Sequence, residues 1–262
     1  MPLSLQDWHA RYQVQAQWTK ALRTYFFELL KTHPQERILD MGCGTGALLP
    51  DLQALSPAEI YGADINFNSL SLAKKGSPDT PLISTDVFHL PFPDDSFDLV
   101  LCHYFLLWTG IPSAALKEMR RITNNSGYVV AFAEPDYGGR IDYPPEFIML
   151  REYQITGLIN AGADPRMGRS LKALFSENGF SDIVCGVYEG SWQKDASRPN
   201  LDSEWQVLEE DLSGILSREE ISVLKKHEMK AIKKGARLIY VPTFYCWGKV
   251  SKSAETKHRP SP

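Results

Sequence analysis

Three aspartates in the first third of the chain each follow a short apolar run, at the place where a strand would end. They are Asp40, Asp64 and Asp86, which follow the runs 38–39, 59–63 and 81–84. If these runs are neighbouring parallel strands, the three carboxylates lie at one edge of a sheet, where open α/β sheets bind ligands. A carboxylate at the end of the second strand can accept hydrogen bonds from both hydroxyls of a ribose. The alternative is that the aspartates are unrelated N-caps of the helices that follow.

Glycines alternate with other residues directly after the first of these aspartates. Gly42, Gly44 and Gly46 are separated by Cys43 and Thr45. Glycine has no Cβ, so the main chain can come close to a ligand at such a turn. The spacing G-x-G-x-G differs from the G-x-G-x-x-G of dinucleotide-binding turns, and a pyrophosphate here would meet the like charge of Asp40. A ligand with an ammonium group would be attracted instead. An ordinary strand–helix turn would explain the glycines but not the aspartate beside them.

The stretch 36–46, ERILDMGCGTG, resembles motif I of the class I S-adenosylmethionine (SAM) dependent methyltransferases, whose usual form is close to (V/I)LD(L/V)GCGTG. In that family the acid and the glycine turn hold the methionine part of SAM. The resemblance implies that Asp64 binds the ribose and that Asp86 accepts a hydrogen bond from the adenine amine. Ile65 and Val87 would pack on the adenine ring. The implied cofactor-binding residues along the strand ends are Asp40, Gly42, Cys43, Gly44, Thr45, Gly46, Asp64, Ile65, Asp86, Val87 and Cys102.

The expected end of the fourth strand argues against a nucleic-acid base as the acceptor. DNA and many RNA amino methyltransferases carry (N/D)PP(Y/F) here, and its last residue stacks on a flipped base. This chain reads CHYF over 102–105 and lacks the prolines. The stretch 105–108, FLLW, resembles the small-molecule branch (methyltransferase type 11) related to ubiquinone and menaquinone methyltransferases, which often has a His-Trp pair where this chain has Leu-Trp. We therefore expect a small-molecule acceptor.

Candidate catalytic residues follow the fourth and fifth strands. Methyl transfer from a sulfonium is an in-line displacement, so the protein chiefly aligns the acceptor and removes water. A base is needed only for a protonated acceptor, and His103 is the first candidate because imidazole titrates near neutral pH. In the polar run 134–140 we expect Tyr137 to be catalytic and Asp136 and Arg140 to bind substrate, with Arg140 able to hold a carboxylate bidentately. The alternatives are a structural histidine and a turn with solvated charges.

The N-terminal region has a helical pattern over residues 5–32, with Arg11, Tyr12 and Trp18 within two turns. Enzymes of the resembled family often close such a helix over the cofactor and touch its carboxylate. We therefore expect Tyr12 and Trp18 at the cofactor. The alternative is a plain amphipathic helix with aromatic core residues.

Strands alternate with helices along the chain, which predicts an α/β fold with a doubly wound, mostly parallel sheet. The expected strands are 36–41, 59–64, 81–84, 97–103, 128–133, 184–188 and 240–250. The expected helices between them are 45–54, 68–75, 112–123 and 169–178. The resemblance implies the seven-stranded Rossmann-like methyltransferase fold, in which the last strand is antiparallel.

We expect three regions along the chain. Residues 1–33 form an N-terminal helical cap, residues 34–250 form the SAM-dependent methyltransferase domain, and residues 251–262 form a disordered tail. Two stretches exceed a minimal fold, at about 134–168 and 190–238, and the second has helical patterns near 202–216 and 218–235. Long excursions at the ligand end of such a sheet are usually lids, so we expect helical lid insertions that cover the substrate.

Composition excludes several functional classes. The chain has 262 residues, 43% of them hydrophobic and 23% charged, with a net charge of −4. Without a basic surplus, a nucleic-acid partner has no electrostatic support. The chain has no secretory signal and no run of about 18 apolar residues, so we expect a cytoplasmic protein without a membrane partner. The four cysteines lack zinc-ligand spacing, so we expect buried reduced thiols and no metal.

These patterns together predict a SAM-dependent methyltransferase that moves a methyl group to an O, N, S or C centre of a small molecule and releases S-adenosylhomocysteine (SAH). Its partner is then a small-molecule substrate, and a homodimer is one option for its assembly. The alternatives are a protein or RNA methyltransferase, an NAD(P)-binding oxidoreductase, and a SAM-binding protein without turnover. The sequence does not name the acceptor, because lids carry no transferable pattern.

Overall fold

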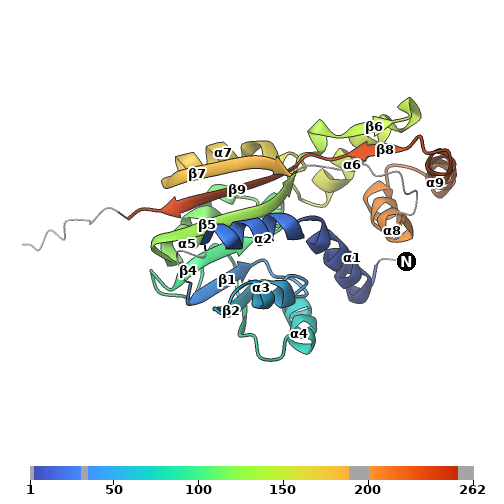
Figure 1. The fold of residues 1–262 in the computed structure, drawn as a ribbon. Coiled ribbons are helices and arrows are strands. Elements are labelled where there is room, and N and C mark those ends of the chain that lie inside the picture. Colours follow the sequence, from blue (N-terminus) through green and yellow to red (C-terminus); the bar gives the residue numbers. More distant parts are fainter. Residues whose placement is uncertain (1–2, 31–34, 189–200, 253–262) are drawn as a thin grey trace, which may run out of the picture.

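The computed structural model describes residues 3–30, 35–188 and 201–252. Its main sheet has seven strands in the order β3-β2-β1-β4-β5-β9-β7 (Figure 1). Their bounds are Arg37–Met41 (β1), Glu59–Asp64 (β2), Leu82–Ser84 (β3), Phe97–Cys102 (β4), Thr123–Pro135 (β5), Phe180–Tyr188 (β7) and Thr243–Val250 (β9). Strands β1 to β5 pair in parallel, and β9 runs antiparallel between β5 and β7. The predicted fold class, including the antiparallel last strand, is confirmed.

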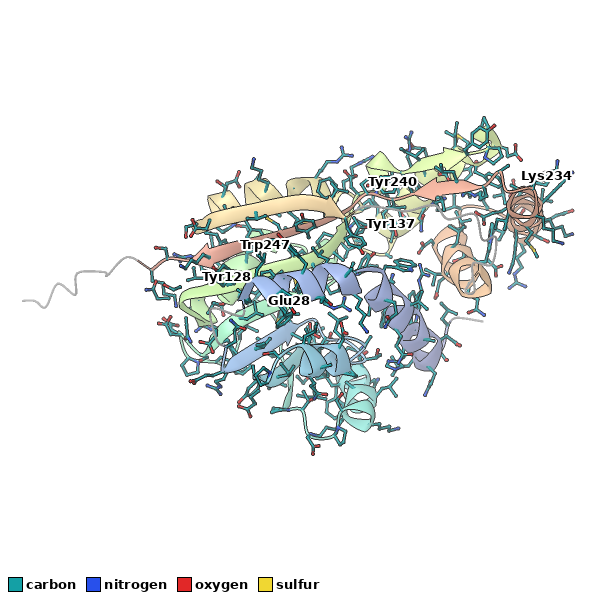
Figure 2. All side chains as sticks on the ribbon, in the orientation of Figure 1. Glu28, Tyr128, Tyr137, Lys234, Tyr240 and Trp247 are labelled. Carbon is teal, nitrogen blue, oxygen red and sulfur yellow. A yellow bond between two sulfur atoms is a disulfide. The ribbon has the colours of Figure 1, made fainter. Side chains whose placement is uncertain are left out.

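Helices cover both faces of this sheet. In the described residues the helices are Leu5–Trp18 (α1), Lys20–Leu29 (α2), Leu49–Leu55 (α3), Phe67–Gly76 (α4), Pro112–Ile122 (α5), Met149–Asn160 (α6), Met167–Glu177 (α7), Leu201–Leu212 (α8) and Arg218–Lys233 (α9). One core cluster joins α5 and α7 to the sheet, and a second joins α2 and α3 to its other face. The Phe26 ring of α2 packs against Tyr128 and Trp247, which Figure 2 labels on the sheet above this helix.

The N-terminal helical pattern is divided into two helices in the structure. α1 ends at Trp18, and the cap residue Thr19 has φ of −106° and ψ of 9°. α2 buries one face in the core against the sheet, whereas α1 extends from the sheet toward the region where α8 lies (Figure 1). We expected the whole helical segment 5–32 to cover the ligand end of the sheet. In the structure only α1 lies there, because α2 packs on a face of the sheet.

The two long insertions meet in one subdomain, which we call the lid and which comprises β6, η4, α6, α8, α9 and β8. The short strands β6 (Ile141–Tyr143) and β8 (Leu238–Tyr240) pair in a second sheet, and η4 spans Pro145–Phe147. The lid has its own apolar cluster, formed by Phe147, Leu150, Trp205, Leu212, Ile221 and Ala231. Figure 1 shows the lid beyond the carboxyl end of β5, beside the free end of α1.

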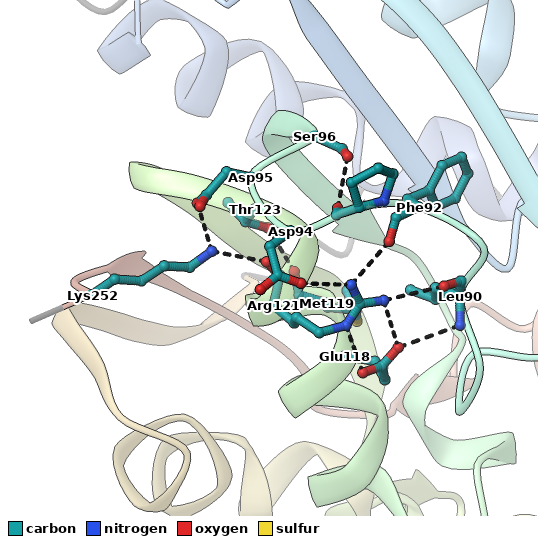
Figure 3. A network of polar contacts seen from close by, with 11 residues as sticks. Leu90, Phe92, Asp94, Asp95, Ser96, Glu118, Met119, Arg121, Thr123 and Lys252 are labelled. Atoms are coloured by element: carbon teal, nitrogen blue, oxygen red, sulfur yellow. Dashed lines mark hydrogen bonds and ion pairs between the residues drawn. The ribbon is translucent and has the colours of Figure 1, made fainter. Parts of the chain in front are cut away.

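The loop between β3 and β4 is fixed by Arg121 of α5 (Figure 3). Its guanidinium pairs with Glu118 and Asp94 and donates to the main-chain oxygens of Leu90 and Phe92. Lys252, which follows β9, pairs with Asp95 in the same loop. The loop begins after Ser84 and contains Asp86, so these contacts hold the segment that carries this aspartate.

Some element bounds differ from the sequence predictions. The predicted strand 240–250 is divided at Val241 and Pro242 between β8 and β9, which belong to different sheets. The helix expected from residue 45 begins at Leu49, because the glycine turn extends further. β7 begins at Phe180 rather than at residue 184. Of the predicted tail, only residues 251 and 252 lie within the described residues.

The expectation of four reduced thiols is wrong for one pair. Cys185 and Cys246 are direct neighbours on β7 and β9, and the structure joins them by a disulfide. Cys43 and Cys102 are free and buried, as expected. Within the described residues no helix is long and apolar enough to cross a membrane.

Candidate functional site

The glycine turn after β1 is packed tightly on two sides. Gly42, Gly44 and Gly46 have φ of +73°, +52° and +77°, a region that other residues rarely adopt. A Cβ at Gly42 would lie 2.1 Å from Cδ2 of Phe105, and one at Gly46 would lie 2.8 Å from Cβ of Ala73 in α4. A Cβ at Gly44 would meet only Asp64 and Tyr12, each at 4.0 Å. The Gly44 face of the turn is therefore its open side.

Asp64 is oriented by two main-chain hydrogen bonds, one of which comes from this turn. Gly44 N donates to Oδ2 and Asn66 N donates to Oδ1, both at 2.8 Å. A carboxylate oxygen accepts more than one hydrogen bond, so both oxygens can still accept from ligand hydroxyls. The following residue, Ile65, is 71% exposed, so its side chain is free to cover an apolar ring. The ribose role of Asp64 and the adenine role of Ile65 stay predictions.

Asp86 lies after β3, and its carboxylate is also oriented by the main chain. Phe88 N donates to Oδ1 at 3.0 Å. The side chain of Asp86 is 43% exposed, so it can accept a hydrogen bond from a ligand amine. Val87 is buried in the core cluster of the sheet and lies beneath the site rather than on its surface.

Asp40, at the end of β1, is buried. Burial raises the pKa of its carboxyl to about 8, while the charge of Arg23 lowers it. A ligand ammonium beside Asp40 would favour the charged form of this carboxyl.

The thiols of Cys43 and Cys102 are buried, and burial raises their pKa well above the ordinary value. Both face the protein interior, so only their main-chain atoms are placed to touch a ligand.

Helix α1 closes over the glycine turn. His9 Nδ1 and Thr45 Oγ1 are hydrogen-bonded at 2.8 Å, and Tyr12 lies beside Gly44 and Asp64. Burial and the charge of Asp64 raise the pKa of Tyr12. This position agrees with the predicted contact between Tyr12 and the cofactor. Trp18 is 41% exposed, and the guanidinium of Arg11 lies 4.8 Å from its ring centroid. Trp18 thus supports Arg11 and is not beside the glycine turn as Tyr12 is.

His103 belongs to a polar chain that ties α2 to β4. Its Nε2 is hydrogen-bonded to Thr19 Oγ1 at 2.7 Å, and Thr19 Oγ1 also accepts from Arg23 Nη1. Arg23 in turn pairs with Asp51 of α3. Burial and the charge of Arg23 lower the pKa of His103 to about 3. A group of this pKa is a weak base at neutral pH, so the structure does not support the predicted role as general base.

Glu134 organises the segment after β4, a role that sequence patterns did not indicate. It is completely buried at the end of β5, and its carboxylate accepts hydrogen bonds from the main-chain N–H groups of Phe105, Leu106 and Leu107. Burial raises its pKa to about 7, against the lowering effect of these hydrogen bonds. Glu134 thereby holds the Phe105 ring in its place against Gly42.

The predicted substrate-binding residues after β5 already have partners. Asp136 is buried and forms a bidentate ion pair with Arg169 of α7. Arg140 is buried, pairs with Asp142 and donates to Gln154 of α6. Both side chains fix the start of the lid, which leaves neither free to hold a substrate as the sequence suggested. Figure 2 shows Tyr137 between the sheet and the lid, and burial raises its pKa to about 12.

One cationic side chain at this place lacks a partner. The Nε and Nη1 atoms of Arg11 are buried and have no hydrogen-bond partner among the described residues. The positive charge of Arg11 lowers the pKa of Tyr104, Tyr137 and Asp211, although burial raises all three on balance. Asp211 of α8 accepts from Gln154 Nε2 at 2.9 Å, and burial raises its pKa to about 6. Sequence patterns missed Asp211, because only the folded lid brings it to β4 and β5.

The described residues contain no group of three His, Cys, Asp or Glu side chains that could hold a metal ion. The structure thus brings the predicted cofactor residues together at the ends of β1, β2 and β3, under α1. On the other side of β1 it places Tyr104, Tyr137, Arg11 and Asp211 between the sheet and the lid. Such an arrangement can bind an adenosyl group at one side and a second molecule at the other.

Comparisons with known sequences identify the segment that carries these features. A sequence profile described as "Methyltransferase domain" matches residues 39–131. The chain is 31% identical to a demethylmenaquinone methyltransferase of Geobacillus kaustophilus, over 58% of this chain and 74% of that protein. It is 31% identical to an uncharacterized methyltransferase of Schizosaccharomyces pombe, over 57% of each chain. It is 34% identical to a malonyl-[acyl-carrier protein] O-methyltransferase of Legionella pneumophila, over 44% of this chain and 43% of that one. The match therefore spans about half the length of these last two relatives.

Solved structures share the fold over most of the chain. A SAM-dependent methyltransferase of Thermotoga maritima, described as a possible histamine N-methyltransferase, superposes with a TM-score of 0.56 at 16% identity. The superposition covers 92% of this chain and 94% of that one. A putative sarcosine dimethylglycine methyltransferase of Galdieria sulphuraria also has a TM-score of 0.56, at 14% identity, over 88% of this chain and 84% of that one. At these identities the likeness concerns the fold alone.

Proposed function

Because the chain belongs to the class I SAM-dependent methyltransferases, we propose that it transfers the methyl group of SAM to a small-molecule acceptor. The observation that carries this proposal is the pairing of Asp64 with Gly44 N at the open side of the glycine turn. It fixes a carboxylate beside the only glycine of the turn whose Cβ position is free of close contacts. A ribose diol can approach there without steric conflict.

The residues around this point fit the remaining parts of SAM. Exposed Ile65 can cover the adenine ring, and Asp86 can accept from its amine. Asp40 lies at the end of β1, where an ammonium group would be attracted to its carboxyl. A dinucleotide would place a pyrophosphate at the same turn, where Asp64 would repel it and where it would disfavour the ionised form of Asp40 still further, whereas an ammonium group favours that form. This charge pattern favours SAM over NAD(P).

The chain's own residues have three tasks in such a reaction. SAM supplies the electrophilic methyl group when it is bound. α1 covers the cofactor cleft through the His9–Thr45 and Tyr12 contacts, which excludes water. Glu134 and Phe105 fix the segment after β4, which borders both the turn and the acceptor side. Tyr137 lies between the sheet and the lid and keeps its proton at neutral pH, as phenols do, so we propose that it orients the acceptor by donating a hydrogen bond.

The names of the similar proteins do not identify the methyl acceptor of this chain. Their names refer to two unlike molecules, demethylmenaquinone and a malonyl-[acyl-carrier protein]. The profile match ends at residue 131, before the lid insertions begin. We therefore propose only a small-molecule acceptor at this stage, and the lid decides which one.

Two experiments test the proposal. Calorimetry with SAM, SAH and NAD should show binding of SAM and SAH, and binding of NAD without SAM would refute the proposal. The protein is then incubated with methyl-labelled SAM and a metabolite extract, and with protein and RNA fractions in parallel. We expect label in the small-molecule fraction. Label only in protein or RNA would identify a macromolecular acceptor, and binding without any transfer would identify a SAM-binding protein that lacks turnover.

A further inference from the structure

Arg11 of α1 is a half-buried residue with two buried guanidinium donors, Nε and Nη1, that have no acceptor among the described residues. Buried cationic donors without an acceptor are costly, so a protein rarely keeps them without a use. The Trp18 ring at 4.8 Å supports one face of the guanidinium and leaves its in-plane donors unused. The guanidinium is therefore prepared for an anion that the protein itself does not supply.

The position of Arg11 on α1 separates it from the cofactor cleft. Successive residues of a helix point about 100° apart. Tyr12 points to Gly44 and Asp64, at the ends of β1 and β2. The charge of Arg11 acts instead on Tyr104, Tyr137 and Asp211, which follow β4 and β5 or belong to the lid. An anion on Arg11 would thus lie on the acceptor side of the site.

From this geometry we propose that Arg11 binds a carboxylate of the methyl acceptor, so that the substrate is a small carboxylic acid. The inference rests on the proposed methyltransferase function and adds the substrate class to it. A carboxylate matches the planar donor pattern of a guanidinium and can be held bidentately. The charges of Arg11 and Asp211 affect each other, and Asp211 also acts on Tyr137, but Arg11 Nε and Nη1 have no hydrogen bond to Asp211 among the described residues. Its negative charge disfavours a doubly charged phosphate at this place.

Benzoate serves as the probe for this site, with benzamide as its uncharged analogue. Each is titrated by calorimetry into the full chain saturated with SAH. We expect benzoate to bind at least about tenfold more tightly than benzamide and than inorganic phosphate. The variant Arg11→Gln should bind benzoate no better than benzamide. Arg151→Gln, on an exposed lid arginine paired with Glu152, is the matched control and should bind benzoate like the wild type. Equal binding of benzoate and benzamide, or unchanged benzoate binding in Arg11→Gln, would overturn the proposal.

A second measurement separates this role from contact with the cofactor's own carboxylate. SAH and 5′-methylthioadenosine differ in that only SAH has an amino-acid part. We expect Arg11→Gln to leave the ratio of their affinities unchanged. A loss of about tenfold for SAH alone would assign Arg11 to the cofactor and refute the proposal. If the wild type binds neither compound, the proposed methyltransferase function fails, which is a different outcome from failure of the benzoate titration.

Thermal stability with and without ligand gives a third readout. Arg11→Gln removes the contact with the Trp18 ring, so the free variant should melt slightly below the wild type. Benzoate should raise the melting temperature of the SAH-saturated wild type and leave that of SAH-saturated Arg11→Gln unchanged. An equal rise in both proteins would overturn the proposal.

Discussion

Gly42 has the least room of the glycines in the turn after β1. Its φ is +73°, and a Cβ there would lie 2.1 Å from the Phe105 ring. Phe105 cannot move away easily, because Glu134 holds its main-chain N–H. This one position therefore couples the cofactor turn to the segment after β4.

The substitution Gly42→Ala should destabilise the protein and weaken SAM binding. We expect a loss of about 2–4 kcal/mol in the free energy of unfolding, from backbone strain and overpacking together. Denaturant unfolding and calorimetry measure the two effects. Gly110→Ala is the matched control, because a Cβ there has nothing within 4 Å. Equal stability of the two variants would contradict the packing that we describe.

Asp64 is the residue whose removal should affect cofactor binding most directly. We expect Asp64→Ala to weaken SAM binding by about 1–3 kcal/mol, the range for lost hydrogen bonds to a charged group. Calorimetry measures this loss, and Asp79→Ala, on an exposed residue after α4, is the control. Unchanged SAM affinity in Asp64→Ala would remove Asp64 from the ribose role.

At the scale of elements, α2 is fixed to the sheet and to α3 through polar contacts at one place. Thr19, at the break between α1 and α2, joins His103 at the end of β4 to Arg23. Arg23 is completely buried and pairs with Asp51 of α3. Since Thr19 Oγ1 accepts from Arg23, its proton can point to Nε2 of His103, and we assign this nitrogen as unprotonated. Protonation of His103 would disrupt the chain.

This arrangement predicts how stability depends on pH. The pKa of His103 falls from 6.5 to about 3 on folding, so the unfolded state binds more protons between these values. The free energy of unfolding therefore decreases as pH falls through this range, by at most about 1.4 kcal/mol per pH unit from this residue. His103→Asn should reduce the slope in denaturant titrations across this range. His89→Asn, whose parent side chain is 86% exposed, should leave it unchanged. A steeper slope in His103→Asn would contradict the assignment.

Element positions were predictable where local patterns decide them. The strands ending at Asp40 and Asp64 follow from apolar runs, and the glycine turn follows from its spacing. The break at Thr19 was not predictable, because it depends on His103, which is 84 positions away in the chain. For the same reason the division of the stretch 240–250 could not be foreseen: β8 pairs with β6, while β9 pairs with β5 and β7.

At the scale of the whole molecule, buried ion pairs hold the lid together. Arg237 pairs with Asp142 of β6 and with Glu228 of α9, and the side chains of Arg237 and Asp142 are each 1% exposed. Asp142 also pairs with Arg140. The Arg237–Asp142 pair joins residues that are 95 positions apart in the chain, so no local pattern indicated it. The Arg140–Asp142 pair explains why Arg140, a plausible anion-binding residue in the sequence, has a structural role instead.

Removal of one partner should loosen the lid selectively. Arg237→Met leaves Glu228 with a buried charge and Asp142 with Arg140 as its remaining cationic partner, and breaking a buried pair costs about 3–5 kcal/mol. We expect faster amide hydrogen exchange in β6, α9 and β8, with little change in β1 and β4. Lys226→Met, on an exposed residue of α9, should change neither region. Uniformly faster exchange across the molecule would show that lid and sheet unfold as one unit.

The separate apolar cluster of the lid, around Phe147 and Trp205, has an evolutionary consequence. Since α6, α8 and α9 bury their own side chains against one another, replacements on their inner surfaces need not disturb the packing beneath the sheet. Proteins that descend from this one can therefore acquire new substrates through changes within the lid, while they inherit the same binding site for the methyl donor.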